Sequence, residues 1–314
     1  MTIEENRKEL LNLLRSFNCE IKDDKARLNS LIPALSGLKI VQYKIPKGMS
    51  IYRARPHKTR NEVFSFEDQI SYRRDYFNID ILGRCNIQQS SKFYGAVTST
   101  EIKHGWMPAI VETSKLYRDG KDGYELYSIG KWKAKEDLYL YAIKPPKHKS
   151  NASDLSKELY GLYEDKKPEP IENEIFEQLG KEFSKNVPSD QNEQYYLSAC
   201  LSEAILNGSQ IGILYPSVQV ESKSYNIVMN PDKFDRYFEI DKVMVSELFK
   251  VKKEVLVRNS DICLNAKSQP FQFYRVEERE YQPDDAVKNR LFKNGISKGD
   301  IDWVFNERKK FLAK

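Results

Sequence analysis

The chain has 314 residues, enough for one large domain or two ordinary ones, and 40% of them are hydrophobic and 31% charged, as in a polar globular protein. Its 51 basic and 46 acidic residues nearly cancel, and the net charge of +5 is spread along the chain instead of forming a basic stripe. This argues against a nucleic-acid-binding protein and is compatible with a small anionic ligand. No apolar run approaches the ~18 residues that a membrane span needs, so no membrane partner is expected.

The cysteines and the first residues indicate a cytoplasmic protein. Cys19, Cys85, Cys200 and Cys263 stand far apart without a Cys-x-x-Cys pair, which is typical of reduced thiols. The first residues are charged where a secretory signal would be apolar. We therefore expect the protein to be cytoplasmic.

The first part of the chain is predicted to contain a helical segment followed by short strands. Leucines and isoleucines at helical spacing predict helix over residues 5–36, which Gly37 ends. Residues 57–80 lack a clear period and predict a long loop, which in a compact domain is more often functional than idle. A helix is expected to begin near Trp106, with Pro108 in its first turn, and to reach Leu116. Strands are predicted at 39–43, 50–54, 92–97, 124–133 and 137–143.

The second part of the chain is predicted to be mainly helical, with two further strands. Residues 193–206 carry the clearest amphipathic pattern, which Asn207 and Gly208 end. An apolar strand is expected from Ile211 to Leu214, broken by Tyr215 and Pro216. Other predicted elements are helices at 153–163 and 171–184, a strand at 225–229 and a C-terminal helix within 265–314. The fold class is therefore α+β.

The sequence lacks the motifs of several common catalytic and nucleotide-binding sites. The histidines His57, His104 and His148 lack metal-site spacing, so no metal is expected. No Gly-x-Ser-x-Gly elbow, Walker loop or Gly-x-Gly-x-x-Gly occurs. A nucleotide site in this chain would therefore rely on arginines for phosphates and on aromatic side chains for rings.

Three separated stretches carry polar or charged side chains suited to such a site. They are Ile-Tyr-Arg-Ala-Arg at 51–55, Ile-Val-Glu-Thr-Ser at 110–114 and Tyr-Pro-Ser-Val at 215–218. Each of these residues alone is more often structural, so their joint order carries the argument. With Gly-Arg-Cys-Asn at 83–86 and Phe-Tyr-Gly-Ala at 93–96 between the first two, the order resembles the RES-domain family over roughly residues 45–235. That family is named for an arginine, a glutamate and a serine.

The resemblance implies a fold and an organisation. RES-domain proteins are bacterial toxins, often paired with an Xre-type antitoxin, whose mixed β core with flanking helices is similar to ADP-ribosyltransferases. On this basis we expect a catalytic domain at 45–260 with insertions near 57–80 and 147–190. Helical extensions are expected at 1–44 and 261–314.

The resemblance also assigns residues by position. It implies three catalytic residues, Arg53, Glu112 and Ser217, and four NAD-binding residues, Arg84, Asn86, Tyr94 and Tyr215. Cleavage of the bond from ribose to nicotinamide passes through an oxocarbenium-like centre, which Glu112 would stabilise. Arg53 and Arg84 would clamp the pyrophosphate, because a guanidinium forks onto phosphate oxygens. Tyr94 could stack on a ring. Without a histidine to activate it, Ser217 is expected to orient a ribose or the nicotinamide amide.

Three functions remain open from the sequence. The first is a NAD-degrading toxin-like enzyme, a NAD glycohydrolase or phosphorylase, with NAD as substrate and no cofactor. The alternative is a mono-ADP-ribosyltransferase that modifies a protein target. The last is a non-catalytic nucleotide- or antitoxin-binding module, against which the intact set of Arg53, Glu112 and Ser217 argues. The expected partners are NAD and a cognate antitoxin or protein target.

Overall fold

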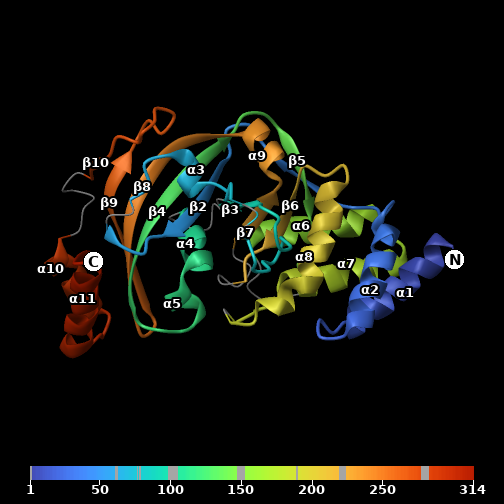
Figure 1. Ribbon diagram of the computed structural model, residues 1–314, viewed down its shortest axis with the longest axis horizontal. Helices are drawn as coiled ribbons and strands as arrows, with labels where there is room; N and C mark the ends of the chain where they lie inside the picture. Colours follow the sequence, from blue (N-terminus) through green and yellow to red (C-terminus); the bar gives the residue numbers. More distant parts are fainter. Residues whose placement is uncertain are drawn as a thin grey trace.

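A continuous mixed sheet organises the molecule (Figure 1). The computed structural model describes residues 2–60, 63–75, 77, 79–97, 105–146, 153–188, 190–218, 224–276 and 283–314. The strands in this part are β1 (Gln42–Ile45), β2 (Ser50–Pro56), β3 (Phe93–Val97), β4 (Gly123–Ala134), β5 (Leu138–Ala142), β6 (Gly212–Pro216), β7 (Tyr225–Met229), β8 (Phe238–Val251), β9 (Glu254–Cys263) and β10 (Tyr274–Arg275). Their order is β1-β5-β6-β7-β3-β2-β4-β8-β9-β10, with β5 and β6 parallel and the other neighbours antiparallel. The predicted α+β class is confirmed.

Helices gather at the two ends of the sheet and under its middle. They are α1 (Ile3–Ser16), α2 (Lys22–Leu31), η1 (Ile32–Leu35), α3 (Glu67–Ile70), α4 (Met107–Thr113), α5 (Lys115–Arg118), α6 (Asp154–Lys166), α7 (Pro170–Phe183), η4 (Asn192–Tyr195), α8 (Tyr196–Asn207), α9 (Pro231–Tyr237), α10 (Asp284–Lys293) and α11 (Lys298–Leu312). In Figure 1, α1, α2, α6, α7 and α8 lie at one end, α10 and α11 at the other, and α4 and α5 beneath the middle. No described helix is long and apolar enough to cross a membrane.

The N-terminal helices pack against α7. A capping box, in which Thr2 accepts from the Glu5 N–H and Glu5 accepts from the Thr2 N–H, starts α1. The leucines of α1 at 10, 11, 13 and 14 are buried, and Arg7 forms an ion pair of 3.0 Å with Glu172 of α7. Most of residues 5–36 are helical, as predicted, but residues 17–21 separate α1 from α2.

Two element ends differ from the expectation, each for a local reason. Strand β6 runs through Tyr215 and Pro216, so the predicted break there is wrong. Pro216 pairs with Tyr225 on the β7 side, while the pairing of β6 with β5 ends at Leu214, so the N–H that proline lacks is not needed there. Helix α4 ends at Thr113 instead of reaching Leu116, because Ser114 caps the short α5 by accepting from the Tyr117 N–H.

The C-terminal third adds a long hairpin that the sequence did not predict. Strands β8 and β9 pair along most of their length, and α10 and α11 cover the face that they share with β4. Residues on both faces of β8 are buried, which removes the period-2 alternation by which a strand is recognised. The boundaries expected at 44/45 and 260/261 both fall inside strands, β1 and β9.

Candidate functional site

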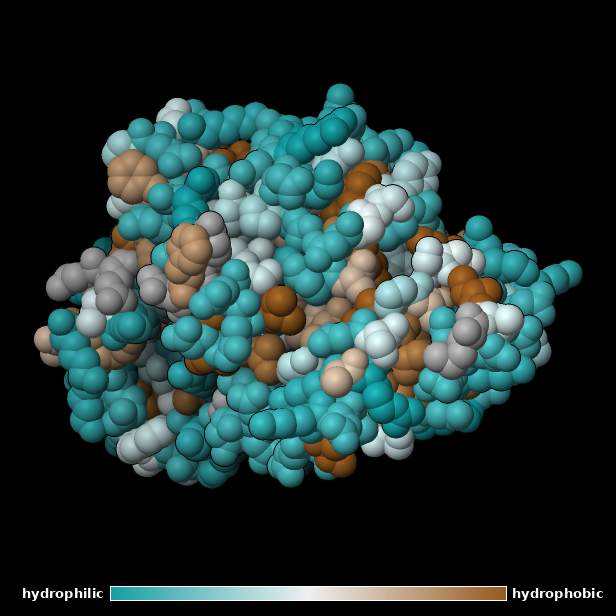
Figure 2. Space-filling model, turned by 45° about the vertical axis from the view of Figure 1, so that its right-hand side comes forward, coloured by the Kyte–Doolittle hydropathy of each residue, from teal (hydrophilic) through white to brown (hydrophobic). Residues whose placement is uncertain are grey.

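A cavity of about 400 Å³ lies where β2 and β3 part. The two strands pair at Ile51–Val97 and Tyr52–Ala96, after which β2 continues to Pro56 against β4 alone. The wall is completed by α4, the end of α5, the 82–86 turn, β6, β7 and η4. The surface visible in Figure 2 is mostly hydrophilic, with apolar side chains showing in places near its middle.

The structure brings the residues that the sequence singled out together at this cavity. Six of them line it, namely Arg53, Arg84, Asn86, Tyr94, Glu112 and Tyr215. The seventh, Ser217, is bonded to Glu112. Other polar residues of the wall were not predicted: Tyr52, Arg55, Arg118, Asn192, Tyr195 and Asn226. A signal existed for Arg55, which follows Arg53 by two residues on a strand and so shares its face. None existed for Arg118.

Glu112 is the single carboxylate in the described part of the cavity wall, and Ser217 holds it. The Ser217 hydroxyl donates to Oε1 of Glu112, and the Ser217 N–H donates to the carbonyl of Ser224 at 2.9 Å. Ser217 is fully buried and does not line the cavity. Ser217 thus lies behind Glu112 and bonds to its carboxylate, and the contact with ribose or nicotinamide that was expected of Ser217 stays a prediction.

Helix α4, which carries Glu112, is anchored at its C-terminal end. Ser114 is fully buried and its hydroxyl donates to Glu125 of β4 at 2.6 Å. The same carboxylate oxygen accepts from the hydroxyl of Tyr127 at 2.6 Å. Arg118 donates to the main-chain carbonyl of Glu112 at 3.3 Å. These bonds fix the height of the Glu112 carboxylate above the sheet.

Arg53 lies in the split between the strands. Its Nη1 donates across the split to the carbonyl of Tyr94 at 3.0 Å, and its guanidinium lies 5.5 Å from the ring centroid of Phe93. Its Nε is buried and has no hydrogen-bond partner among the described residues. Burial, reinforced by the neighbouring Arg55, lowers the pKa of Arg53 to about 10, so it remains a cation at neutral pH. Arg53 lines the cavity, so an acceptor that enters it would meet a guanidinium that is not paired with a carboxylate among the described residues.

The turn at 83–86 is held against β3 by Tyr94. The Tyr94 hydroxyl donates to Oδ1 of Asn86 at 2.7 Å and accepts from the Cys85 N–H at 3.1 Å. A Cβ at Gly83 would overlap Asn86 Oδ1, so any larger residue there would displace the Asn86 side chain from its bond with Tyr94. Burial raises the pKa of Tyr94 well above its ordinary value, so the hydroxyl stays protonated and can donate.

Arg84 also forms structural hydrogen bonds that the sequence did not predict. Its Nη1 donates to the carbonyls of Phe183 and Lys185, at 2.9 Å and 3.0 Å, where α7 ends. Its guanidinium lies 4.9 Å from the ring centroid of Tyr195. With Nη1 occupied, only Nε and part of Nη2 remain for the pyrophosphate contact predicted for Arg84.

The remaining reactive side chains near the cavity are unsuited to catalysis. Cys85 is fully buried, and burial raises the pKa of its thiol to about 12, which keeps it neutral. His57 is buried and its Nε2 shares a hydrogen bond of 2.9 Å with Ser128. His104 and His148 lie outside the described residues.

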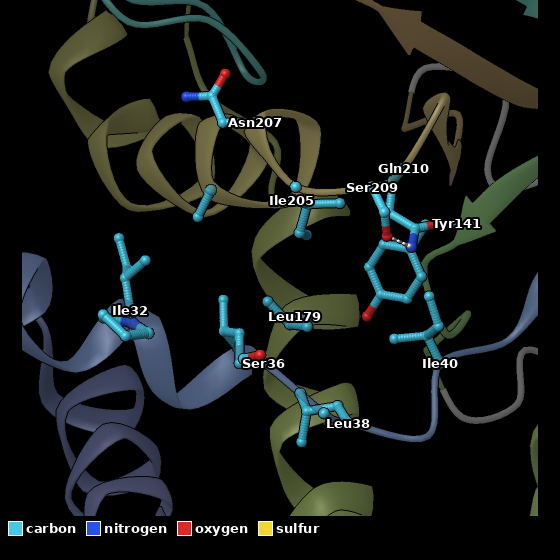
Figure 3. Close-up of a pocket in the computed structure, with 15 residues that line it drawn as sticks. Ile32, Ser36, Leu38, Ile40, Tyr141, Leu179, Ile205, Asn207, Ser209 and Gln210 are labelled. Atoms are coloured by element: carbon cyan, nitrogen blue, oxygen red, sulfur yellow. Dashed lines mark hydrogen bonds between the residues drawn. The ribbon is translucent and has the colours of Figure 1, made fainter.

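A larger cavity, of about 520 Å³, lies between η1, α7, α8 and β5 (Figure 3). Its wall is mainly apolar, with Leu38, Ile40, Leu179 and Ile205 pointing into it, and it contains no acidic or basic side chain. Tyr141 is its only ionisable group among the described residues, and burial raises the pKa of that phenol far above its ordinary value. Chemistry, not size, therefore selects the smaller cavity as the candidate active site.

Comparison with known proteins finds no family model that matches the chain and no matching curated protein.

Proposed function

We propose that this protein is a NAD-degrading enzyme of the RES-domain type, with an ADP-ribosyltransferase-like core, that cleaves the bond from nicotinamide to ribose. One observation carries the proposal. Residues from five stretches between positions 53 and 217 converge on one cavity, and Glu112, the only carboxylate among the described residues of its wall, is held by Ser217. The three residue types that give the RES family its name thus meet at one place.

The charge and size of the cavity support a dinucleotide. Arg53, Arg84 and two further arginines face Glu112 alone, so the wall is strongly positive. A volume of about 400 Å³ lies within the range of small-molecule sites, roughly 300–1,000 Å³. Tyr52, Tyr195 and Tyr215 add aromatic surface on which rings can stack.

The reaction needs few protein groups. The C1′–N bond breaks, and its electron pair moves to the nicotinamide nitrogen, which neutralises the pyridinium. The ribose then carries oxocarbenium character, and the Glu112 carboxylate stabilises this charge. The oxygen of water, or of inorganic phosphate, forms the new bond to C1′, and attacking water loses a proton to solvent. The arginines hold the phosphates so that the ribose stays beside Glu112.

Purified protein incubated with NAD, with and without inorganic phosphate, tests the proposal. We expect nicotinamide release together with free ADP-ribose or ADP-ribose 1″-phosphate. Glu112→Gln should abolish most of the release, whereas Glu136→Gln, at an exposed position away from the cavity, should not. Label that stays on protein would favour the transferase alternative. No loss of NAD, even with a co-expressed partner, would overturn the proposal.

A further inference from the structure

The described residues of the cavity wall carry more positive charge than NAD can neutralise. Four arginines line it, Arg53, Arg55, Arg84 and Arg118, and among the described residues none of them forms an ion pair. Glu112 is the only acidic side chain among the described residues of the wall, which leaves these residues with a net excess of three positive charges. The pyrophosphate of NAD brings two negative charges, and the nicotinamide ring removes one of them. A large part of the excess would remain unmatched.

Arg55 is the arginine least explained by the protein itself. It packs on the ring of Phe64, at 5.5 Å from the ring centroid, and one of its nitrogens donates to the carbonyl of Gln69. Burial and the nearby Arg73 lower the pKa of Arg55, so its surroundings oppose its charge. Arg73 is matched by Asp75, at 2.6 Å, but no carboxylate pairs with Arg55 in the described part of the chain.

Arg55 and Arg118 belong to different walls of the cavity. Arg118 contacts the main chain of Glu112 and so lies at the end where the reaction takes place. Arg55 contacts Phe64 and Gln69 of the 57–80 segment instead. A phosphate on the adenosine ribose is remote from the nicotinamide, so it would be met by the wall that does not carry the reacting carboxylate.

We propose that the cavity prefers a dinucleotide with an additional phosphate monoester on its adenosine ribose, as in NADP, and that Arg55 binds this phosphate. The inference rests on the proposed function, because it names the substrate class of the same site. A phosphate monoester carries about −1.5 to −2 charges at pH 7, close to the excess that NAD leaves. An arginine near the adenosine ribose is also the usual means of accommodating a 2′-phosphate.

The test compares NADP with NAD for the wild type and for three variants. We expect wild-type kcat/KM to be at least about tenfold higher for NADP, since a charge-assisted bond to phosphate is strong. Arg55→Gln should lower the ratio of NADP to NAD by about 10- to 100-fold. Arg55→Lys should restore part of it, because lysine keeps the charge without the fork. Arg118→Gln, the matched control, should leave the ratio unchanged.

Binding measurements decide the inference without turnover. Calorimetry with ADP-ribose and with its 2′-phosphate should show tighter binding of the phosphorylated form, lost in Arg55→Gln. Equal binding by the wild type, or an unchanged ratio in Arg55→Gln, would overturn the inference and leave NAD cleavage intact. If Arg55→Gln changed only the dependence of the reaction rate on inorganic phosphate, the inference would also be overturned, because Arg55 would then bind the phosphate that acts as acceptor. If neither dinucleotide is cleaved, the proposed function fails, while the binding comparison still decides the preference.

Discussion

Two groups of arginines in this protein have opposite surroundings. Under the C-terminal helices, the side chains of Arg258 and Arg308 are 1% and 16% exposed, and both bind the carboxylates of Glu247 and Asp284 at 2.6 to 3.1 Å. Tyr124 completes this cluster by donating to Glu247 at 2.8 Å. In the cavity between β2 and β3, four arginines share the wall with one carboxylate.

The difference shows what each group is for. In the C-terminal cluster every charge finds its counter-charge inside the protein, so the arginines lock α10 and α11 onto the sheet. In the cavity the described residues leave most of the arginine charges unmatched, which is typical of sites that bind an anion. The four variants below test this distinction, from the largest expected effect to the smallest.

The largest effect is expected in the C-terminal cluster. Arg258→Met leaves Arg308 as the one basic partner of both Glu247, whose side chain is 5% exposed, and Asp284, whose side chain is 43% exposed. We expect a loss of about 3–5 kcal/mol in the free energy of unfolding, measured by urea titration, because removing one member of a buried ion-pair cluster leaves the charge of Glu247 incompletely balanced. Lys310→Met, at an exposed ion pair, is the control and should change stability by less than about 1 kcal/mol. Similar losses of stability in both variants would show that the cluster does not hold α10 and α11 on the sheet.

The next effect is on activity. Glu112→Gln keeps an oxygen to accept from Ser217 but removes the negative charge beside the ribose. Nicotinamide release should fall by about 10²–10³-fold, as for other lost electrostatic contacts to a transition state. Urea titration should give a stability close to that of the wild type. Retained activity would mean that the reacting bond does not lie beside Glu112.

Arg53→Gln separates the two groups of arginines most directly. Loss of its contact with phosphate should reduce kcat/KM for the dinucleotide by about 10- to 100-fold. The melting temperature should stay the same or rise, because the variant removes a buried charge that no described carboxylate pairs with. A destabilisation as large as that of Arg258→Met would erase the distinction between the groups.

The smallest effect is expected at Ser217, which touches Glu112 and does not line the cavity. Ser217→Ala should lower kcat by about tenfold, the value of one hydrogen bond to a charged group, and leave KM unchanged. Steady-state kinetics over a range of substrate concentrations separates the two parameters. A rise in KM at constant kcat would instead indicate that the serine contacts the substrate.

The sequence predicted the parts of the fold whose pattern is local. Helix α8 and strands β3, β4, β5 and β7 lie close to their predicted positions. The hairpin of β8 and β9 was missed because residues on both faces of β8 are buried, so no alternation marks it. The end of β6 was misplaced because the effect of a proline depends on which strand edge is paired.

The candidate site was predictable to the extent that its residues lie in ordered motifs. All seven predicted residues meet at or directly behind one cavity. Asn226 was missed because only the pairing of β6 with β7 sets it opposite Tyr215. The bonds from Arg84 to the end of α7 could not be foreseen, because they join residues about a hundred positions apart. Contacts that depend on topology leave no trace in a single sequence.

The continuity of the sheet bears on what the protein can lose and still work. The strand that carries Arg53 lies between β3 and β4, and β4 is paired along its length with β8, which the C-terminal helices cover. Shortening the chain at residue 44 or at residue 260 would cut β1 or β9 in two. Cleavage within either strand would therefore interrupt the same continuous sheet that positions Arg53, although neither strand lines the cavity.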